Sequence, residues 1–122
     1  MEYSVTKQLD IQAIIVNASG LINTEVAEKM VLQAGITTTI SGYKRCLFDL
    51  TNTTLDPGQL RSEMFMFADI LKNAGFTNSI KIASLLTEVD EHRKSLEISA
   101  TSKGLNLKHF TDRNEALSWL CS

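Results

Sequence analysis

The sequence is poor in the residue patterns that mark catalysis or metal binding. It has two histidines, His92 and His109, and neither lies at metal-ligand spacing from a cysteine, a carboxylate or the other histidine. It also lacks a glycine-rich phosphate loop, a nucleophile elbow and a Walker pattern. We therefore expect no catalytic residues, no metal site and no cofactor, and we predict that the chain is not an enzyme.

Long apolar runs and an excess of either charge are also lacking. No stretch approaches the roughly 20 apolar residues that span a bilayer, and the N-terminus lacks the pattern of a secretory signal. The formal net charge is -2, and the 12 Lys and Arg residues are scattered, with no run longer than a pair such as Lys44-Arg45. We expect a soluble, cytoplasmic protein without membrane insertion or a nucleic-acid surface.

Cysteine is scarce too. Cys46 lies in an apolar run and Cys121 is the penultimate residue, so a disulfide between a buried strand and a frayed end is not expected. Cys46 is best interpreted as a small buried hydrophobic residue. With 122 residues, 43% of them hydrophobic, the chain fits a single domain over 1–122.

The most informative stretch is residues 44–60, KRCLFDLTNTTLDPGQL. Residues 46–50 are apolar without a helical stripe, which predicts a buried central strand. Asp56 followed by Pro57 predicts the N-cap and first position of a helix. Loops from the carboxyl end of a central strand into a helix often carry function in open α/β sheets. We therefore predict a loop at 51–58 and look there first for a functional site.

Four further strands are predicted from apolar alternation or short apolar runs, at 3–9, 12–17, 79–86 and 105–110. The short link between the first two predicts an antiparallel hairpin. Residues 18–20, Ala-Ser-Gly, are expected to break the second of these strands.

Four helices are predicted from helical spacing and end signals. The first is capped by Asn23 or Thr24, runs to about residue 34 and continues more loosely to Gly42, because Gly35 and the threonines at 37–39 are poor helix formers. The second spans 57–74 and ends at Gly75. The third is capped by Thr87, with Glu88, Asp90 and Glu91 in its first turn, and runs to Lys103; a short fourth begins at Thr111.

The resulting order, β-β-α-β-α-β-α-β-α, predicts an α/β fold. The sheet should have about five mostly parallel strands, an antiparallel N-terminal strand and four helices.

Three local patterns in this order resemble the STAS domain, and more closely its SpoIIAA-like (STAS/SEC14) branch. They are residues 15–22 with Ala27-Glu28, the strand at 46–50, and the closing residues 110–120 with Glu-Ala-Leu-Ser-Trp-Leu. Together they extend over nearly the whole chain. The resemblance implies the SpoIIAA-like fold, and each motif is short and mainly structural.

Antagonists of anti-sigma factors in this family carry a phosphorylated serine just after the central strand, at the start of the second helix. The matching residues here, 55–59, read Leu-Asp-Pro-Gly-Gln, with no serine or threonine after Asp56. The resemblance therefore implies that the phosphoswitch is absent. Thr53, Thr54 and Ser62 are the nearby hydroxyl residues that would have to replace it.

Two carboxylates near this stretch, Asp49 and Asp56, allow two interpretations. They could form a pair for acid–base chemistry or a metal, or Asp56 could cap a helix while Asp49 ends a strand; we favour the second. His92 is predicted on a solvated helix face, and His109 on an outer strand beside Lys108. The cluster at 64–67, Met-Phe-Met-Phe, is mostly expected in the core, although Phe65 or Met66 could line a docking or lipid-accepting surface.

Our first hypothesis is a non-catalytic regulatory or protein-interaction module. It would bind a protein partner, or a second copy as a homodimer, through the end of the central strand and the second helix. The residues of this predicted surface are Thr51, Asn52, Thr53, Thr54, Asp56, Gly58, Gln59, Ser62, Glu63, Phe65 and Met66. The alternative is a carrier of a small apolar or lipid-like molecule held between the helices and the sheet.

Overall fold

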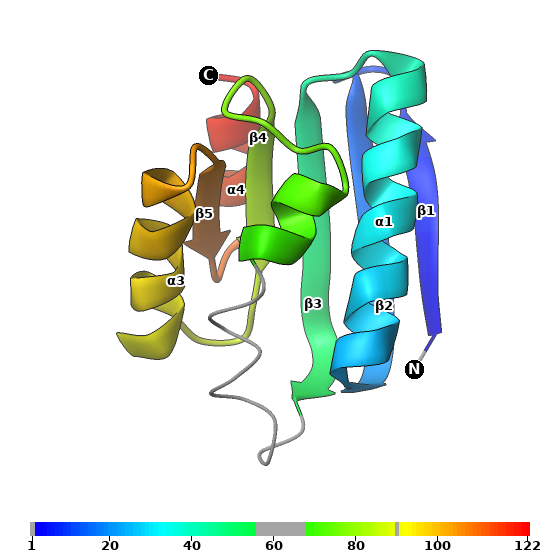
Figure 1. Cartoon of the computed structure of the whole chain (residues 1–122). Coiled ribbons are helices and arrows are strands. Elements are labelled where there is room, and N and C mark those ends of the chain that lie inside the picture. Colours follow the sequence, from blue (N-terminus) through cyan, green and yellow to red (C-terminus); the bar gives the residue numbers. More distant parts are fainter. Residues whose placement is uncertain (1, 56–67, 90) are drawn as a thin grey trace.

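The structure, a computed structural model, describes residues 2–55, 68–89 and 91–122. In chain order the elements are β1 (Glu2–Gln8), β2 (Ala13–Ile22), α1 (Thr24–Ser41), β3 (Arg45–Leu55), β4 (Lys81–Leu85), α3 (Glu91–Ser102), β5 (Asn106–Phe110) and α4 (Arg113–Leu120) (Figure 1). Residues 68–73 form a further helical segment between β3 and β4. The predicted α/β architecture is confirmed.

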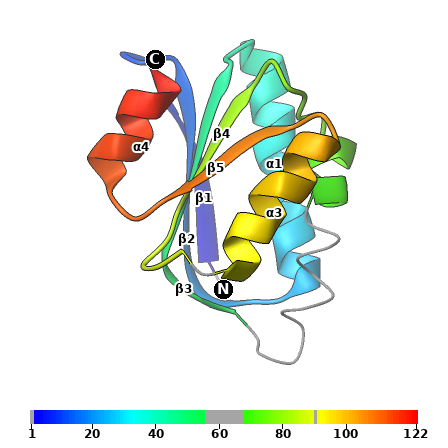
Figure 2. The same cartoon turned by 90° about the vertical axis from the view of Figure 1, so that its left-hand side faces the viewer.

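The described strands form one sheet in the order β1-β2-β3-β4-β5. β1 pairs with β2 in antiparallel fashion, and the remaining pairs are parallel. The predicted hairpin and the central place of the strand at 46–50 are both confirmed. Each right-handed crossover steps to the next strand in the same direction, so α1, segment 68–73 and α3 cover one face, and α4 lies on the other (Figure 2).

Two apolar cores result, because successive side chains of a strand point to opposite faces. On the face of α1 and α3, Phe48 of β3 packs among Met30, Leu71 and Leu96. On the face of α4, a smaller core joins Leu47 of β3 to side chains of β2, β4, β5 and α4, namely Ala13, Ile15, Ala83, Leu85, Phe110, Ala116 and Leu120. β3 is therefore buried on both faces over its first half, as its unbroken apolar run predicts.

Strands β2 and β3 are both longer than predicted. β2 continues through residues 18–20 to Ile22, and β3 continues through 51–54 to Leu55, where the two extensions pair with each other. The predicted strand break at 18–20 and the predicted loop at 51–55 are therefore wrong. Backbone hydrogen bonds of the parallel ladder outweigh the weak strand preference of Gly20 and Asn52. A prediction from local propensity alone gives these two residues too much weight.

Helix α1 is regular to Ser41, so the predicted weakening after residue 34 is wrong. Thr37 and Thr38 donate their hydroxyls to the carbonyls of the preceding turn, at 2.9 and 2.7 Å. The predicted ends are confirmed: the Asn23 side chain accepts the Val26 N–H at 2.9 Å, and Gly42 adopts the left-handed conformation with φ 73°.

Other boundaries differ by a few residues. α3 begins at Glu91 rather than after a Thr87 cap, so Glu88 lies outside its first turn. α4 is capped by Asp112 rather than Thr111, since Asp112 accepts the N–H groups of Asn114 and Glu115. Gly75, with φ 101°, follows the helical segment 68–73 as predicted; the predicted helix start at Pro57 lies outside the described residues.

Both cysteines are free thiols, with Cys46 buried in β3 and Cys121 exposed. The expectation of no disulfide, and of a buried Cys46, is confirmed. Among the described residues, no helix combines the length and apolar character needed to cross a membrane.

Candidate functional site

A β-bulge interrupts β3 just beyond the buried half of the sheet. Asn17 of β2 lies opposite Asp49, but Ser19 lies opposite Asn52, so one residue of β2 faces two residues of β3. Bulges of this kind re-aim side chains and are common next to functional sites. Here the bulge falls at Leu50 and Thr51, halfway along the middle strand and just before its carboxyl-terminal half.

Side chains of β3 itself hold the bulge together. One carboxylate oxygen of Asp49 accepts the backbone N–H of Thr51 at 3.1 Å and its hydroxyl at 2.7 Å. The hydroxyl of Thr53 donates to the carbonyl of Leu50 at 2.6 Å. These bonds give the Thr51 N–H and the Leu50 carbonyl a side-chain partner at the bulge, so the bulge is a built feature of the chain.

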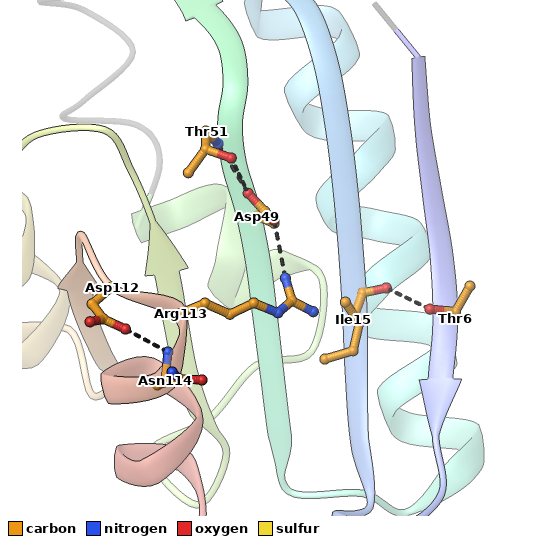
Figure 3. A network of polar contacts seen from close by, with 7 residues as sticks. All are labelled: Thr6, Ile15, Asp49, Thr51, Asp112, Arg113 and Asn114. Atoms are coloured by element: carbon orange, nitrogen blue, oxygen red, sulfur yellow. Dashed lines mark hydrogen bonds and ion pairs between the residues drawn. The ribbon is translucent and has the colours of Figure 1, made fainter.

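The other oxygen of Asp49 joins the bulge to helix α4. It accepts a hydrogen bond from Nη1 of Arg113 at 3.1 Å (Figure 3). Arg113 is the first residue of α4, where the helix dipole disfavours a cation. The Asp49 side chain is 18% exposed and that of Arg113 is 44% exposed. Asp49 therefore compensates an unfavourable helix start and places α4 beside β3.

The opposite end of α4 is held by two cations from the amino ends of the parallel strands. Nε of Arg45 donates to the carbonyl of Leu120 at 2.8 Å, and Nζ of Lys81 donates to that of Trp119 at 3.0 Å. Cations are favourable at a helix C-terminus. α4 is thus fixed at both ends, which also fixes the surroundings of the bulge.

Beyond the bulge, the face of the sheet that carries α4 is open to solvent. Asn52 and Thr54 of β3 are exposed and lie opposite Ser19 and Leu21 of β2. Leu21 is 53% exposed. We call Ser19, Leu21, Asn52 and Thr54 the carboxyl-edge patch; it offers hydroxyl and amide groups around one apolar side chain.

The structure places four of the predicted surface residues in β3. Asn52 and Thr54 are exposed in the carboxyl-edge patch, whereas Thr51 and Thr53 are half-buried and bonded within the bulge. The others lie outside the described residues: Asp56, Gly58, Gln59, Ser62, Glu63, Phe65 and Met66.

For Asp49, the interpretation as a strand end is wrong, because β3 continues to Leu55. Its described partners are the Arg113 guanidinium and the backbone N–H and hydroxyl of Thr51. No group of three or more metal-ligating side chains occurs within the described ranges. Sequence reasoning missed Arg113, because its partner Asp49 lies 64 positions away in the chain and no local pattern links the two.

A second polar cluster lies inside the molecule, around His109. Glu97 of α3 accepts the backbone N–H of His109 at 2.6 Å and contacts Nδ1 at 3.1 Å. His109 is 7% exposed and lies opposite the buried Ser84 of β4. The outer-strand position of His109 is as predicted, and its contact with Glu97 is one that the sequence analysis did not anticipate. Glu97 occupies an N–H at the outer edge of β5, which protects that edge from pairing with another strand.

The fold defined by this sheet and its helices is the SpoIIAA-like fold, and solved structures share it over nearly the whole chain. An uncharacterized protein of the DUF3478 family from Shewanella loihica, with a SpoIIAA-like fold, aligns over 98% of this chain and 93% of its own, with 20% identity and a TM-score of 0.56. An anti-sigma factor antagonist from Mycobacterium paratuberculosis aligns over 99% and 96%, with 14% identity and a TM-score of 0.60.

The unphosphorylated anti-sigma factor antagonist SpoIIAA aligns over 97% of this chain and 96% of its own, with 9% identity and a TM-score of 0.54. No protein-family model and no curated protein sequence matches the chain. The fold expected from the STAS resemblance is therefore confirmed.

Proposed function

We propose that this chain is a non-catalytic regulatory module that binds a partner protein through the carboxyl-edge patch. The observation that carries the proposal is the bulge in β3, which directs Asn52 and Thr54 to solvent at the end of the middle strand. Two of the proteins that share the fold are antagonists of anti-sigma factors. The partner we propose is a regulatory protein of that anti-sigma class.

The chemistry of the patch suits a protein surface. Asn52, Thr54 and Ser19 supply hydrogen-bond donors and acceptors beside the exposed Leu21, and protein interfaces combine apolar and polar groups in this way. Arg113 uses one guanidinium nitrogen on Asp49, which leaves further N–H donors for a carboxylate of the partner. The predicted contacts at 56–66 remain part of the proposed surface.

We further propose that binding does not require phosphorylation after β3. Residues 56–60 read Asp-Pro-Gly-Gln-Leu and contain no hydroxyl side chain. A phosphate at the start of the following helix would be stabilised by backbone N–H groups, and this stretch offers no residue to carry it. Incubation with kinases of the source organism should leave affinity for the partner unchanged.

The experiment is to isolate the partner from the source organism, purify it, and measure its dissociation constant by calorimetry. Asn52→Arg and Thr54→Arg should each raise that constant by about tenfold or more, and Glu63→Lys should also raise it. Lys94→Glu, an exposed change on α3, is the control and should have no effect. Unchanged affinity in the two β3 variants would refute the proposed surface.

The carrier alternative requires an apolar cavity between the helices and the sheet. In the described part of the chain, the side chains at this boundary, including Met30, Val31, Leu71 and Leu96, are at most 4% exposed and pack on the sheet. This packing favours the interaction module. Native mass spectrometry of the purified protein separates the two functions, since a carrier would retain a small molecule.

A further inference from the structure

A hollow with basic walls lies at the amino ends of β3 and β4, at the end of the sheet opposite the carboxyl-edge patch (Figure 1). Its volume is about 280 Å³, close to the lower end of the range for small-molecule sites. Cations and neutral polar groups line it, and no Asp or Glu is among its described lining residues. We call this feature the basic hollow; its polar side chains are those of Gln12, Lys44, Arg45, Ser79, Lys81 and Ser122.

Two of the cations lie side by side on neighbouring strands. Arg45 of β3 is directly opposite Lys81 of β4 in the parallel ladder. Both side chains point to the face of α4, as do Leu47 and Ala83 two residues further along each strand. Like charges opposite each other on a sheet destabilise it. A negative group placed between the two side chains would remove this repulsion.

The C-terminus of α4 supplies only part of the compensating charge. Its carbonyls accept hydrogen bonds from Arg45 and Lys81, and a helix C-terminus is equivalent to about half a negative charge. Lys44 adds a third positive charge to the hollow. A terminal carboxylate on Ser122 would neutralise one more charge and would still leave the balance positive. Asp10, close to Gln12 in the sequence, accepts the N–H of its neighbour at 3.0 Å and does not line the hollow.

Lys44 and Arg45 keep hydrogen-bond donors for a ligand. Arg45 uses Nε and Nη1 on backbone carbonyls, and its Nη2 donates to no residue within the described ranges. Lys44 is exposed and forms no ion pair in the same part of the chain. The ammonium of Lys81 makes three hydrogen bonds to oxygens of Trp119 and Ser122, so it contributes charge and no free donor.

Gln12 lines the hollow in a strained backbone conformation. Its φ is 53°, and it is the one non-glycine residue with a positive φ in the described part of the chain. Glycine adopts this conformation at a lower cost, yet this turn carries an amide that can donate hydrogen bonds. Residues held in such conformations are common at binding sites.

We propose that the basic hollow binds the phosphate group of a small phosphomonoester. Such a phosphate carries about −1.5 to −2 charges at pH 7, which matches a site with more than one uncompensated cation. The Arg45 guanidinium and the Lys44 ammonium donate to the phosphate oxygens, and the Gln12 amide adds a third donor. The remaining volume takes the alcohol part of the ester. A carboxylate, with one charge, would compensate the site less completely.

The test is titration of the full chain with inorganic phosphate and with glycerol 3-phosphate, at an ionic strength held constant with sodium chloride. Amide shifts in NMR spectra report the binding. We expect saturable shifts confined to residues 12, 42–45 and 79–81, with a dissociation constant at or below about 1 mM and tighter binding of the ester. Phosphatidylcholine vesicles that contain phosphatidic acid should not bind the chain, because the hollow takes a free ester and not a lipid headgroup.

Three variants test the named residues. Lys44→Gln should raise the dissociation constant of glycerol 3-phosphate at least about threefold and leave Tm unchanged, because Lys44 is exposed. Lys29→Gln makes the same charge change near the other end of α1 and is the matched control, which should bind as the wild type does. Gln12→Gly should weaken binding and raise Tm, because glycine relieves the positive φ.

Shifts that do not saturate overturn the proposal, and so does equal weakening by Lys44→Gln and Lys29→Gln, because both would report a general attraction of anions. Binding to the vesicles without binding to the soluble ester also overturns it. A Gln12→Gly variant that gains Tm and keeps full affinity would contradict the site as described. The result is independent of the proposed function, since Lys44→Gln lies at the opposite end of the sheet and should leave partner affinity at the carboxyl-edge patch unchanged.

Discussion

Replacing Gly35 by alanine should destabilise the fold, although the same change stabilises most helices. Gly35 lies in the buried face of α1, and a Cβ there would overlap the Ala74 carbonyl oxygen and lie 2.9 Å from its carbon. Ordinary contact begins near 3.4 Å. The two segments would have to separate by more than the carbon distance alone requires, because the oxygen overlaps further than the carbon does, and a backbone carbonyl cannot rotate away as a side chain can.

The magnitude follows from two opposing contributions. Overpacking of a filled core costs about 1–3 kcal/mol, and a clash with backbone belongs at the upper end. Alanine in place of glycine within a helix returns about 1 kcal/mol. We therefore expect Gly35→Ala to lower the free energy of unfolding by about 2 kcal/mol, which for a chain of this length lowers Tm by roughly 8 °C.

Urea unfolding followed by circular dichroism at 222 nm measures this change. Gln33→Ala on the exposed face of α1 is the control and should change stability by less than about 0.5 kcal/mol. Ala74→Gly should not rescue Gly35→Ala, because the overlap is with the backbone of residue 74. A Gly35→Ala variant as stable as the wild type would refute the close approach of α1 and 68–74.

Three further predictions concern the bulge, the edge of β5 and the buried thiol. Asp49→Ala should lower the free energy of unfolding, measured with urea, by about 1–3 kcal/mol, because it leaves the bulge without its hydrogen-bond acceptor. Arg113→Ala removes only a half-exposed ion pair and should lower it by less than about 1 kcal/mol. Equal losses in the two variants would contradict this division. Glu97→Ala should destabilise by about 1–3 kcal/mol and raise the hydrogen-exchange rate of β5, and unchanged exchange would argue against the edge contact. Burial raises the pKa of the Cys46 thiol, so a thiol reagent should label only Cys121 in the folded chain. The free energy of unfolding should fall above a pH of about 8.5, because there only the unfolded chain loses the Cys46 proton. Cys46→Ala should remove that part of the pH dependence.

The order of the elements could be predicted because its signals are local. Asn23 before α1 and Gly42 after it act on their own helix, and the apolar run at 46–50 is confined to one strand. Such signals depend on neighbours in the chain and need no knowledge of the rest of the molecule.

The lengths of β2 and β3 could not be predicted in the same way. Residues 19–22 and 52–55 have weak strand patterns and are extended because each pairs with the other, across a distance of more than thirty residues in the chain. The threonines at 37–39 show the converse, since packing and side-chain bonds to the preceding turn keep α1 regular where propensity predicts weakness.

The candidate site was located from the sequence only in part. The carboxyl end of β3 was the correct place to look, because a central strand must end at a sheet edge. The bond from Arg113 to Asp49 joins residues 64 positions apart, and the bond from Glu97 to His109 depends on how α3 lies across β5. Neither pairing has a spacing that a single sequence reveals.

The agreement between strand order and chain order has a consequence for how the molecule assembles. Each strand pairs with the one synthesised just before it, so no strand has to be inserted between two that are already joined. Only the first pair is a short hairpin, whereas each parallel pair joins residues about 25 to 36 positions apart and is expected to form more slowly. The sheet can still grow from its first hairpin as the polypeptide leaves the ribosome. Until residues 113–120 emerge, Ala13, Ile15, Leu47 and Ala83 have no cover, which makes the nascent chain most prone to aggregate shortly before synthesis ends.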